Sequence, residues 1–386
     1  MIYLDHSATS PILPSAKKAM ENALENFPGN ASALHTPGHL AHNLIEEARE
    51  NIAKLINADP EEIIFTSGGS EANNTVIHTF KNCEIFASAI EHPSILEPAK
   101  TYAKKLHQIP VDKDGVINLD FLKKSLKNTA KNTLCSVMLA NNELGTIEPI
   151  TEVKSIISAL KSSDNIYLHT DATQALGKIK IDVKKLDIAY LTASAHKIGG
   201  PVGIGILYVK KGAPYQPLIL GGHQEHGKRA GTYNTVAIAG FGAVAKYATT
   251  HKTWETYESE VRPLRDKLAN LILKNIKGSA LNTPLSLSLP NILNVSFAAA
   301  EGESIQLYLD MLGKIIVSTG SACASGDGKP SHVIMATRND AEVAHSSIRF
   351  SLGLNTKKSD IDAVMKELPN IIKNLQGIST IEVKND

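Results

Sequence analysis

The sequence predicts an α/β protein with a large domain built on a mostly parallel sheet and a smaller α+β domain. Between residues 62 and 209, short apolar runs of strand length alternate with segments of helical periodicity, the pattern of strand–helix–strand units. A long polar helical stretch at residues 254–274 separates this part from a second group of strands and helices. We expect residues 15–252 to form the large domain, and residues 1–14 and 253–386 to form the small one.

The expected elements follow from the spacing of apolar residues. Two helices come first, at residues 15–24 and 39–55. The strands of the large domain are expected at residues 62–65, 84–87, 133–139, 166–169, 188–191 and 204–209, with helices between them at 95–106, 119–126 and 151–160. In the small domain, strands at 292–297, 315–317 and 346–351 accompany helices at 304–312 and 359–375, and residues 282–290 form a loop.

Composition limits the classes of function. The net charge of +1 gives no basic field that would attract nucleic acid. The longest apolar runs have the length of strands, well short of the roughly 20 residues that a membrane helix needs. The first residues lack the pattern of an export signal, and three cysteines are too few for a disulfide framework. We therefore expect a cytoplasmic protein that binds neither nucleic acid nor membrane.

A lysine and an aspartate near strand ends suggest the chemistry of pyridoxal 5'-phosphate (PLP). Lys197 closes the segment Ser194-Ala195-His196-Lys197 after one expected strand, and Asp171 follows another. Burial favours the neutral, nucleophilic form of a lysine, which can form a Schiff base with an aldehyde cofactor. A nearby aspartate can keep a pyridine nitrogen protonated. Alone, Lys197 could reach solvent and Asp171 could cap a helix, but their occurrence together favours PLP.

The segment Thr66-Ser67-Gly68-Gly69-Ser70-Glu71 is a candidate phosphate site. It lies between an expected strand and a helix, so backbone N–H groups at Gly69 and the hydroxyl of Ser70 can face a phosphate at the helix N-terminus. The alternative is a tight turn with Ser70 as the helix cap. Because the sequence has no Walker A or G-x-G-x-x-G pattern, a cofactor phosphate is favoured over a nucleotide.

His92 and Gln174 are candidates for contact with a flat ring. His92 follows the expected strand at residues 84–87, where an imidazole can stack on a ligand or transfer protons. An ordinary loop histidine is the alternative. Gln174 comes one turn after Asp171 and can donate a hydrogen bond to a ring oxygen.

Arg349 and Cys323 are candidates for substrate chemistry. Arg349 can bind a carboxylate through two parallel hydrogen bonds, or can be a solvated charge. Cys323 lies in a run of small residues, which suggests an exposed nucleophile, whereas Cys83 and Cys135 lie in apolar strands and are expected in the core. Arg229 lies in a glycine-rich loop suited to anions.

Closely spaced histidines do not predict a resident metal ion. His35, His39 and His42 cannot share one helix face, because Pro37-Gly38 interrupts the segment. His223 and His226 are also closely spaced.

These motifs resemble cysteine desulfurases of the NifS/IscS type, which belong to the class V aminotransferases and are PLP enzymes of fold type I. The likeness runs from Tyr3 to about Leu375. Its most specific pieces are Phe65-Thr66-Ser67-Gly68, Asn141-Asn142-Glu143, Asp171-Ala172-Thr173-Gln174, Ser194-Ala195-His196-Lys197, Arg229-Ala230-Gly231-Thr232, Gly320-Ser321-Ala322-Cys323 and Ser347-Ile348-Arg349.

The resemblance implies how the cofactor would be bound. Lys197 would hold PLP covalently, Asp171 would bind its ring nitrogen, and His92 would stack on the ring and relay protons. Asn142 and Gln174 would lie beside the phenolic oxygen. The phosphate would be bound by four residues of one subunit and one residue of its partner in a homodimer: Gly69, Ser70, Ser194 and His196, with Thr232 from the other subunit.

The resemblance also implies a reaction and partners. Arg349 would bind the carboxylate of L-cysteine, with Asn142 close by, and Cys323 would take up the sulfur as a persulfide, leaving L-alanine. The sulfur would then pass to an Fe–S cluster scaffold or a tRNA-thiolation protein, and Cys323 could contact a nascent Fe–S cluster. Relatives with a longer C-terminal tail use it to dock a scaffold, and this chain ends at Asp386.

Two departures and two alternatives accompany this interpretation. Gly69-Ser70 stands where alanine and threonine are commoner, and Pro28 precedes the glycine of the 27–32 segment. A selenocysteine lyase, or another fold-type-I enzyme acting on a small amino acid, is the enzymatic alternative. The non-enzymatic alternative is a PLP-binding scaffold or regulator.

Overall fold

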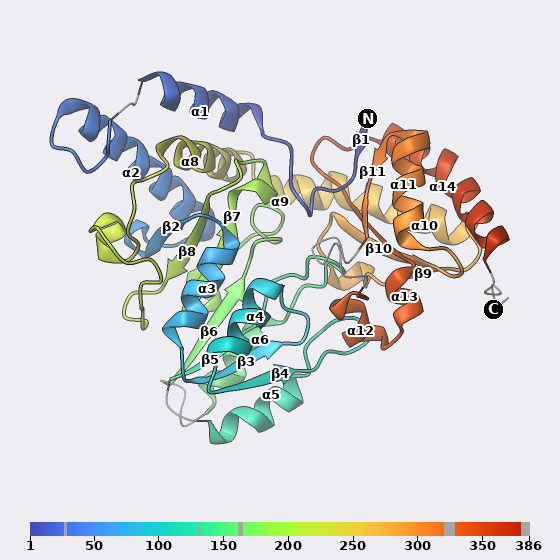
Figure 1. Ribbon diagram of the computed structural model, residues 1–386, viewed down its shortest axis with the longest axis horizontal. Coiled ribbons are helices and arrows are strands. Elements are labelled where there is room, and N and C mark those ends of the chain that lie inside the picture. Colours follow the sequence, from blue (N-terminus) through green and yellow to red (C-terminus); the bar gives the residue numbers. More distant parts are fainter. Residues whose placement is uncertain (27–28, 130–131, 161–164, 320–328, 380–386) are drawn as a thin grey trace.

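The computed structural model describes residues 1–26, 29–129, 132–160, 165–319 and 329–379. Figure 1 shows two groups of elements, one around a large sheet and one around a smaller sheet that the C-terminal helices flank. Each group has its own buried apolar cluster, with Ile52, Leu191 and Phe241 in the first and Val295, Leu309 and Phe350 in the second. The domain limits expected at residues 14/15 and 252/253 stay a prediction.

The large sheet has seven strands in the order β2-β8-β7-β6-β5-β3-β4. The strands are β2 (Ile63–Thr66), β3 (Glu84–Ser88), β4 (Lys105–Ile109), β5 (Thr133–Ser136), β6 (Ile166–Asp171), β7 (Tyr190–Ser194) and β8 (Gly205–Val209). The pairs from β4 through β7 are parallel, and β8 runs antiparallel to both of its neighbours. The mostly parallel sheet predicted from the sequence is therefore confirmed.

Helices cover both faces of this sheet. They are α1 (Pro14–Asn26), α2 (Thr36–Ile56), α3 (Gly69–Thr79), α4 (Pro93–Tyr102), α5 (Leu119–Ser125), α6 (Ile150–Ser158), α7 (Val183–Leu186) and α8 (Thr235–Thr250). The α8 helix packs against both α1 and α2. The α8 helix is not predicted from the sequence, because nearly all of its central residues are apolar and buried, so it has no amphipathic stripe to reveal a helical period.

One helix prediction in the large domain is wrong at its end. The helix expected at residues 95–106 stops at Tyr102, and Lys105–Ile109 form the edge strand β4, parallel to β3. The backbone turns extended at Ala103, and the Asn82 N–H bonds to the Tyr102 carbonyl, which ends the helix. Because β4 is half-buried, its mixed pattern resembles the continuation of a surface helix.

The smaller sheet is antiparallel, with strand order β12-β13-β10-β9. Its strands are β9 (Ser279–Leu281), β10 (Ile292–Phe297), β12 (Ser318–Thr319) and β13 (Ser347–Ser351), and a two-stranded parallel sheet joins β1 (Ile2–Tyr3) to β11 (Ile315–Ile316). The helices here are α9 (Thr253–Thr256), α10 (Arg262–Asn275), α11 (Gly302–Gly313), α12 (His332–Arg338), α13 (Ala341–His345) and α14 (Lys358–Ile378). The short elements β1, β9, β12, α12 and α13 were not predicted.

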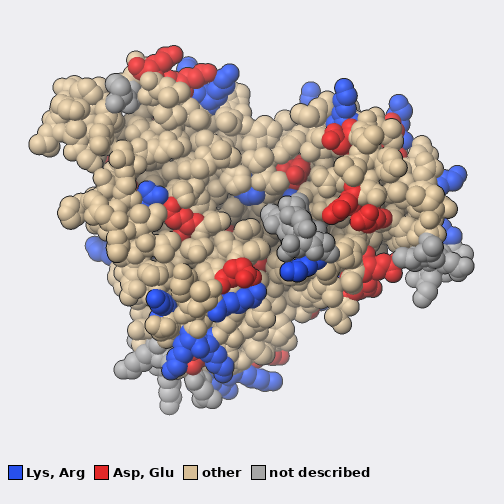
Figure 2. All heavy atoms as spheres, viewed as in Figure 1, with Lys and Arg blue, Asp and Glu red and all other residues tan. Residues whose placement is uncertain are grey.

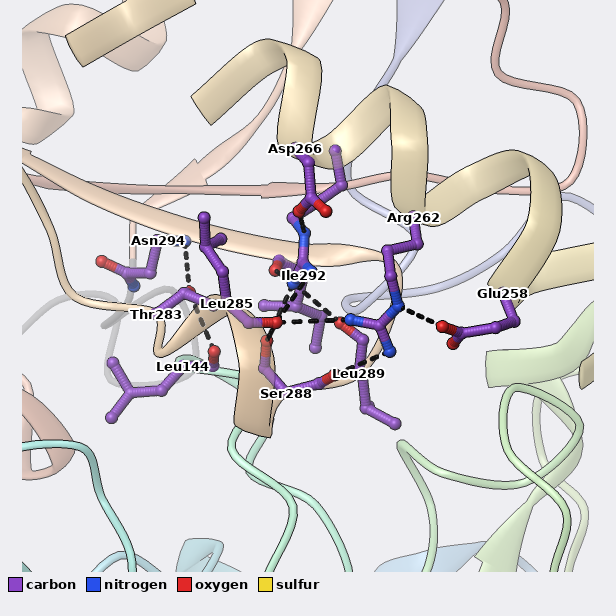
Figure 3. Close-up of polar contacts among 11 residues, drawn as sticks. Leu144, Glu258, Arg262, Asp266, Thr283, Leu285, Ser288, Leu289, Ile292 and Asn294 are labelled. Carbon is purple, nitrogen blue, oxygen red and sulfur yellow. Dashed lines mark hydrogen bonds and ion pairs between the residues drawn. The ribbon is translucent and has the colours of Figure 1, made fainter. Parts of the chain in front are cut away.

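The helical connector at residues 254–274 is confirmed, and it holds the loop that precedes β10. The side chain of Arg265 is buried and donates to the Ser288 hydroxyl and to the carbonyls of Leu285 and Leu289. Figure 3 shows Arg262 of the same helix between this loop and Glu258, with which it forms an ion pair of 2.7 Å. The predicted loop at residues 282–290 is thereby fixed to α10.

Within the described residues, no helix is long and apolar enough to cross a membrane. On the face shown in Figure 2, acidic and basic side chains lie interspersed among uncharged ones. This distribution agrees with the near-zero net charge of the chain.

Candidate active site

The predicted site residues meet at one cavity of about 370 Å³ at the carboxyl edge of the large sheet. Of the twelve residues proposed from the sequence, ten line it: Gly69, Ser70, His92, Asn142, Asp171, Gln174, Ser194, His196, Lys197 and Arg349. Thr232 is exposed and lies outside this cavity, and Cys323 lies outside the described residues. The carboxyl edge of a parallel sheet is where open α/β folds bind ligands.

Lys197 lies on the single helical turn, Ala195–Ile198, that follows β7. Its Nζ donates to the carbonyl oxygens of Ser7 at 2.6 Å and Ala8 at 2.7 Å. These acceptors come from the N-terminal segment after β1, which crosses from the small sheet to the large one. The amine is thus held at the wall of the cavity, in a position that the sequence could not specify because the acceptors lie 189 and 190 residues away.

Asp171 is the last residue of β6, and its carboxylate is buried and fixed from two sides. Asn73 Nδ2 on α3 donates to Oδ2 at 2.7 Å, and the Thr173 N–H donates to Oδ1 at 2.9 Å. Asn73 and Thr173 also line the cavity, and neither was predicted from the sequence as a site residue. For Asn73, the available signal was a polar residue among the apolar residues of α3, one turn after Ser70.

His92 is the N-cap residue of α4 and is oriented by that helix. Its Nδ1 accepts the Ser94 N–H at 3.1 Å and lies 2.7 Å from the Ser94 hydroxyl oxygen. Burial lowers the pKa of His92, the charge of Lys197 lowers it further, and Asp171 opposes this shift. Since Nδ1 accepts, the neutral ring carries its proton on Nε2.

The end of the cavity at α3 has the features of an anion site. Gly69 and Ser70 are the first residues of that helix, where unpaired N–H groups and the helix dipole favour negative charge. His196 lies nearby with Nδ1 3.2 Å from the Thr9 hydroxyl oxygen. Burial, then Lys197 and Lys178, lower the pKa of His196 to about 4.

Arg349 lies on β13 and enters the cavity from the small sheet. Its guanidinium is buried, with Nη1 donating to the Asn142 carbonyl at 3.0 Å and Nη2 donating to Asp5 Oδ1 at 2.9 Å. Its Nε is buried without a hydrogen-bond partner among the described residues. The solvated alternative for Arg349 is therefore wrong.

The remaining candidate residues have structural partners. Arg229 pairs with Glu71, the third residue of α3, at 2.9 Å. Cys135 is buried in the core as expected, but the core position expected for Cys83 is wrong, because Cys83 precedes β3 and is only half-buried against a neighbouring cluster. The His35 Nδ1 caps α2 by accepting the Gly38 N–H, and no cluster of three or more potential metal ligands occurs in the described part of the chain.

The donors and acceptors around the cavity fit PLP. An aldehyde needs a lysine, a pyridinium nitrogen needs a buried carboxylate, and a phosphate needs a helix N-terminus; Lys197, Asp171 and the start of α3 supply these groups around one space. The Thr173 hydroxyl lines this space and has no hydrogen-bond partner among the described residues. A Cβ atom at Gly69 would lie 3.2 Å from that hydroxyl, so the glycine keeps the space open.

Comparison with known proteins agrees with this geometry. The model of the family "Aminotransferase class-V" matches residues 2–364. A protein of Dictyoglomus turgidum named cysteine desulfurase IscS is 44% identical, over 98% of this chain and 96% of its own length. A Clostridium botulinum protein of the same name is 42% identical, over 98% of this chain and 96% of its own length.

Solved structures give the same relationship. A NifS-like protein from Rickettsia africae superposes with a TM-score of 0.88 at 34% identity, covering 97% of this chain and 99% of its own. A structure described as SspA in complex with cysteine has a TM-score of 0.77 at 29% identity, covering 91% of this chain and 99% of its own. The chain therefore belongs to the class-V aminotransferase family, with the fold of the NifS-like proteins, and is a homologue of the cysteine desulfurase IscS proteins.

Proposed function

We propose that this protein is a PLP-dependent cysteine desulfurase that converts L-cysteine to L-alanine and leaves the sulfur on Cys323. The observation that carries the proposal is the convergence of Lys197, the buried Asp171 and the buried Arg349 on one cavity. The names of the relatives that are 42–44% identical support the same activity.

Three residues that line the cavity would bind the cofactor and transfer protons. Lys197 would hold the cofactor covalently and carry protons at its Nζ, while Asp171 would bind the ring nitrogen. His92, neutral and fixed by Ser94, would face the ring and exchange protons at Nε2. When bound, PLP would supply an electron-withdrawing ring that stabilises negative charge on the substrate carbons.

Arg349 is suited to the carboxylate of an amino acid. Its Nε lacks a partner among the described residues, and its Nη2 is paired with the half-buried Asp5. An incoming carboxylate would satisfy Nε and compete with Asp5 for the guanidinium, forming the charge-assisted bonds that arginine makes in pairs. The α-carboxylate of cysteine would thereby be held opposite Asp171 and Lys197.

The overall transfer needs no added oxidant. The Cys323 sulfur would bond to the sulfur of L-cysteine as the substrate C–S bond breaks, and the carbon would take up a proton, giving L-alanine and a Cys323 persulfide. We propose that an Fe–S cluster scaffold or a tRNA-thiolation protein in the cytoplasm accepts this sulfur.

The test is an assay of the purified protein reconstituted with PLP. Incubation with L-cysteine and an external thiol should release alanine and sulfide in equal amounts. Arg349→Lys should retain PLP but raise KM for cysteine roughly thirtyfold. The lysine ammonium cannot make the second of the two parallel hydrogen bonds that a guanidinium makes to a carboxylate, and one such charge-assisted bond is worth about 2 kcal/mol. Arg338→Lys, outside the cavity, is the matched control. An unchanged KM in Arg349→Lys would remove Arg349 from the substrate site.

We further propose that the enzyme is a homodimer in which Thr232 completes the phosphate site of the partner. Thr232 is exposed, and its loop is anchored through Arg229 to Glu71 and through Glu225 to Arg49. Large exposed apolar side chains on α1, on α2 and the segment just before it, and on the loops after β7 and β8 support an interface here: Leu24, Leu34, Leu40, Val202 and Leu220.

A mixed dimer tests this arrangement. Thr232→Val should weaken PLP retention, because a phosphate contact is lost. A dimer of one Lys197→Ala subunit and one Thr232→Val subunit should keep one fully competent site, since the first subunit still supplies Thr232 to the second. If Thr232 instead serves its own subunit, the mixed dimer will show only the impaired site of the Thr232→Val subunit.

A further inference from the structure

Lys178 is a buried lysine behind the cavity that the proposed reaction does not use. It lies four residues after Gln174 in the turns that follow β6, and 1% of its side chain is exposed. Its Nζ donates to the Gln174 backbone carbonyl at 3.0 Å and to the Gln174 side-chain oxygen, Oε1, at 3.4 Å. Both hydrogen bonds of the buried Lys178 amine therefore go to Gln174, so the amine can influence the orientation of that residue.

The charges around Lys178 are positive. Within the described part of the chain, no carboxylate forms an ion pair with it, and burial together with Lys197 and Arg349 lowers its pKa to about 7. His6 and His196 also lie within its electrostatic reach. Whether charged or neutral, the amine keeps at least two N–H donors, so the contacts with Gln174 persist through pH 7.

These contacts select one orientation of the Gln174 amide. In that orientation Oε1 faces the Lys178 amine, and Nε2 donates to the Ser7 carbonyl at 3.0 Å. The reverse orientation would place Oε1 beside the Ser7 carbonyl oxygen, and both of these atoms are acceptors. It would also place Nε2 beside the Lys178 amine, and both of these groups are donors. Because Nε2 has two hydrogens, one remains for a ligand in the cavity that Gln174 lines.

We propose that Lys178 is a positioning residue that holds the Gln174 amide with an N–H group toward the phenolic oxygen of PLP. The inference rests on the proposed function. A donor at that oxygen stabilises its negative charge and so lowers the pH at which the visible absorbance of the covalently bound cofactor changes. A glutamine free to flip would offer an acceptor part of the time and would lose this effect.

The experiment is a spectroscopic pH titration of the holoenzyme without substrate. Lys178→Met should raise the midpoint of the absorbance change by about one pH unit, the size of shift that one hydrogen bond or neighbouring charge produces. Gln174→Met should raise it similarly. The double variant should shift no further than the larger single variant, because Lys178 acts through Gln174. Lys178→Gln, which keeps an N–H donor, should shift the midpoint less.

Lys180→Met is the matched control, because Lys180 is exposed and lies two residues after Lys178. The midpoint of the absorbance change should be the same in this variant as in the wild type. Lys178→Leu replaces Lys178→Met if the methionine variant fails to fold. An unchanged midpoint in a folded Lys178 variant would overturn the inference. Shifts that add in the double variant would also overturn it, because Lys178 would then act by its own charge. If the wild-type protein develops no visible band with PLP, the proposed function itself fails.

Discussion

Lys197→Ala is expected to abolish covalent attachment of PLP and to reduce alanine formation at least about a thousandfold. The Lys197 amine is the cavity-lining lysine fixed by the carbonyls of Ser7 and Ala8, and it is proposed both to hold the cofactor and to transfer protons. Loss of a positioned proton-transfer group alone costs about 10²–10⁴ in rate. The measurement is borohydride reduction of the holoenzyme followed by peptide mapping, together with the alanine assay.

Lys178 provides an internal check on this result. It is the buried lysine whose pKa is lowered to about 7, so it is also nucleophilic at neutral pH, but it does not line the cavity. The assignment of Lys197 as the lysine that binds PLP would be refuted by either of two results. The reduced cofactor could be found on the peptide that contains Lys178, or PLP could still be attached covalently in Lys197→Ala. Lys180→Ala should behave as wild type.

Cys323→Ser is expected to leave PLP binding intact and to eliminate alanine formation from cysteine. Serine cannot form a persulfide, and a hydroxyl is a poor nucleophile toward sulfur. The other two cysteines cannot replace Cys323, because burial raises the pKa of Cys83 and raises that of Cys135 to about 12, which suppresses the thiolate that would attack. Alanine release and persulfide labelling with a thiol-specific reagent measure the outcome.

Cys83→Ser is the matched control and should retain activity and persulfide labelling. If Cys323→Ser makes sulfide from cysteine at the wild-type rate, sulfur leaves by elimination. Cys323 would then have no part in the transfer, and the lyase alternative would replace the desulfurase proposal.

Local pattern was sufficient for much of the fold. The strand–helix alternation predicted the large mostly parallel sheet, and the polar periodicity at residues 254–274 predicted the helical connector, because these elements bury one face or both in a regular repeat. Elements without such a repeat were missed. The α8 helix, whose central residues are nearly all apolar, packs against α1 and α2, and β4 occupies the end of the helix predicted at residues 95–106.

Residue chemistry at strand ends also pointed to part of the candidate site, whereas Asn142, Ser194, His196 and Thr232 were proposed only from the family resemblance. Lys197, Asp171 and His92 were identified because polar residues that end or closely follow buried strands of one mostly parallel sheet meet at its carboxyl edge. The roles of the twelve proposed residues stay predictions. For Cys323, which lies outside the described residues, the sequence is the whole basis of the proposal.

Only the tertiary structure decided which groups hold these residues in place. The Ser7 and Ala8 carbonyls that accept from Lys197, the Asn73 amide that fixes Asp171, and the Ser7 carbonyl that accepts from Gln174 Nε2 depend on side-chain direction and packing. Sequence spacing reports which face of an element a residue occupies. It does not report which atoms from residues about a hundred or more positions away approach that face, because the packing of the whole chain sets those distances.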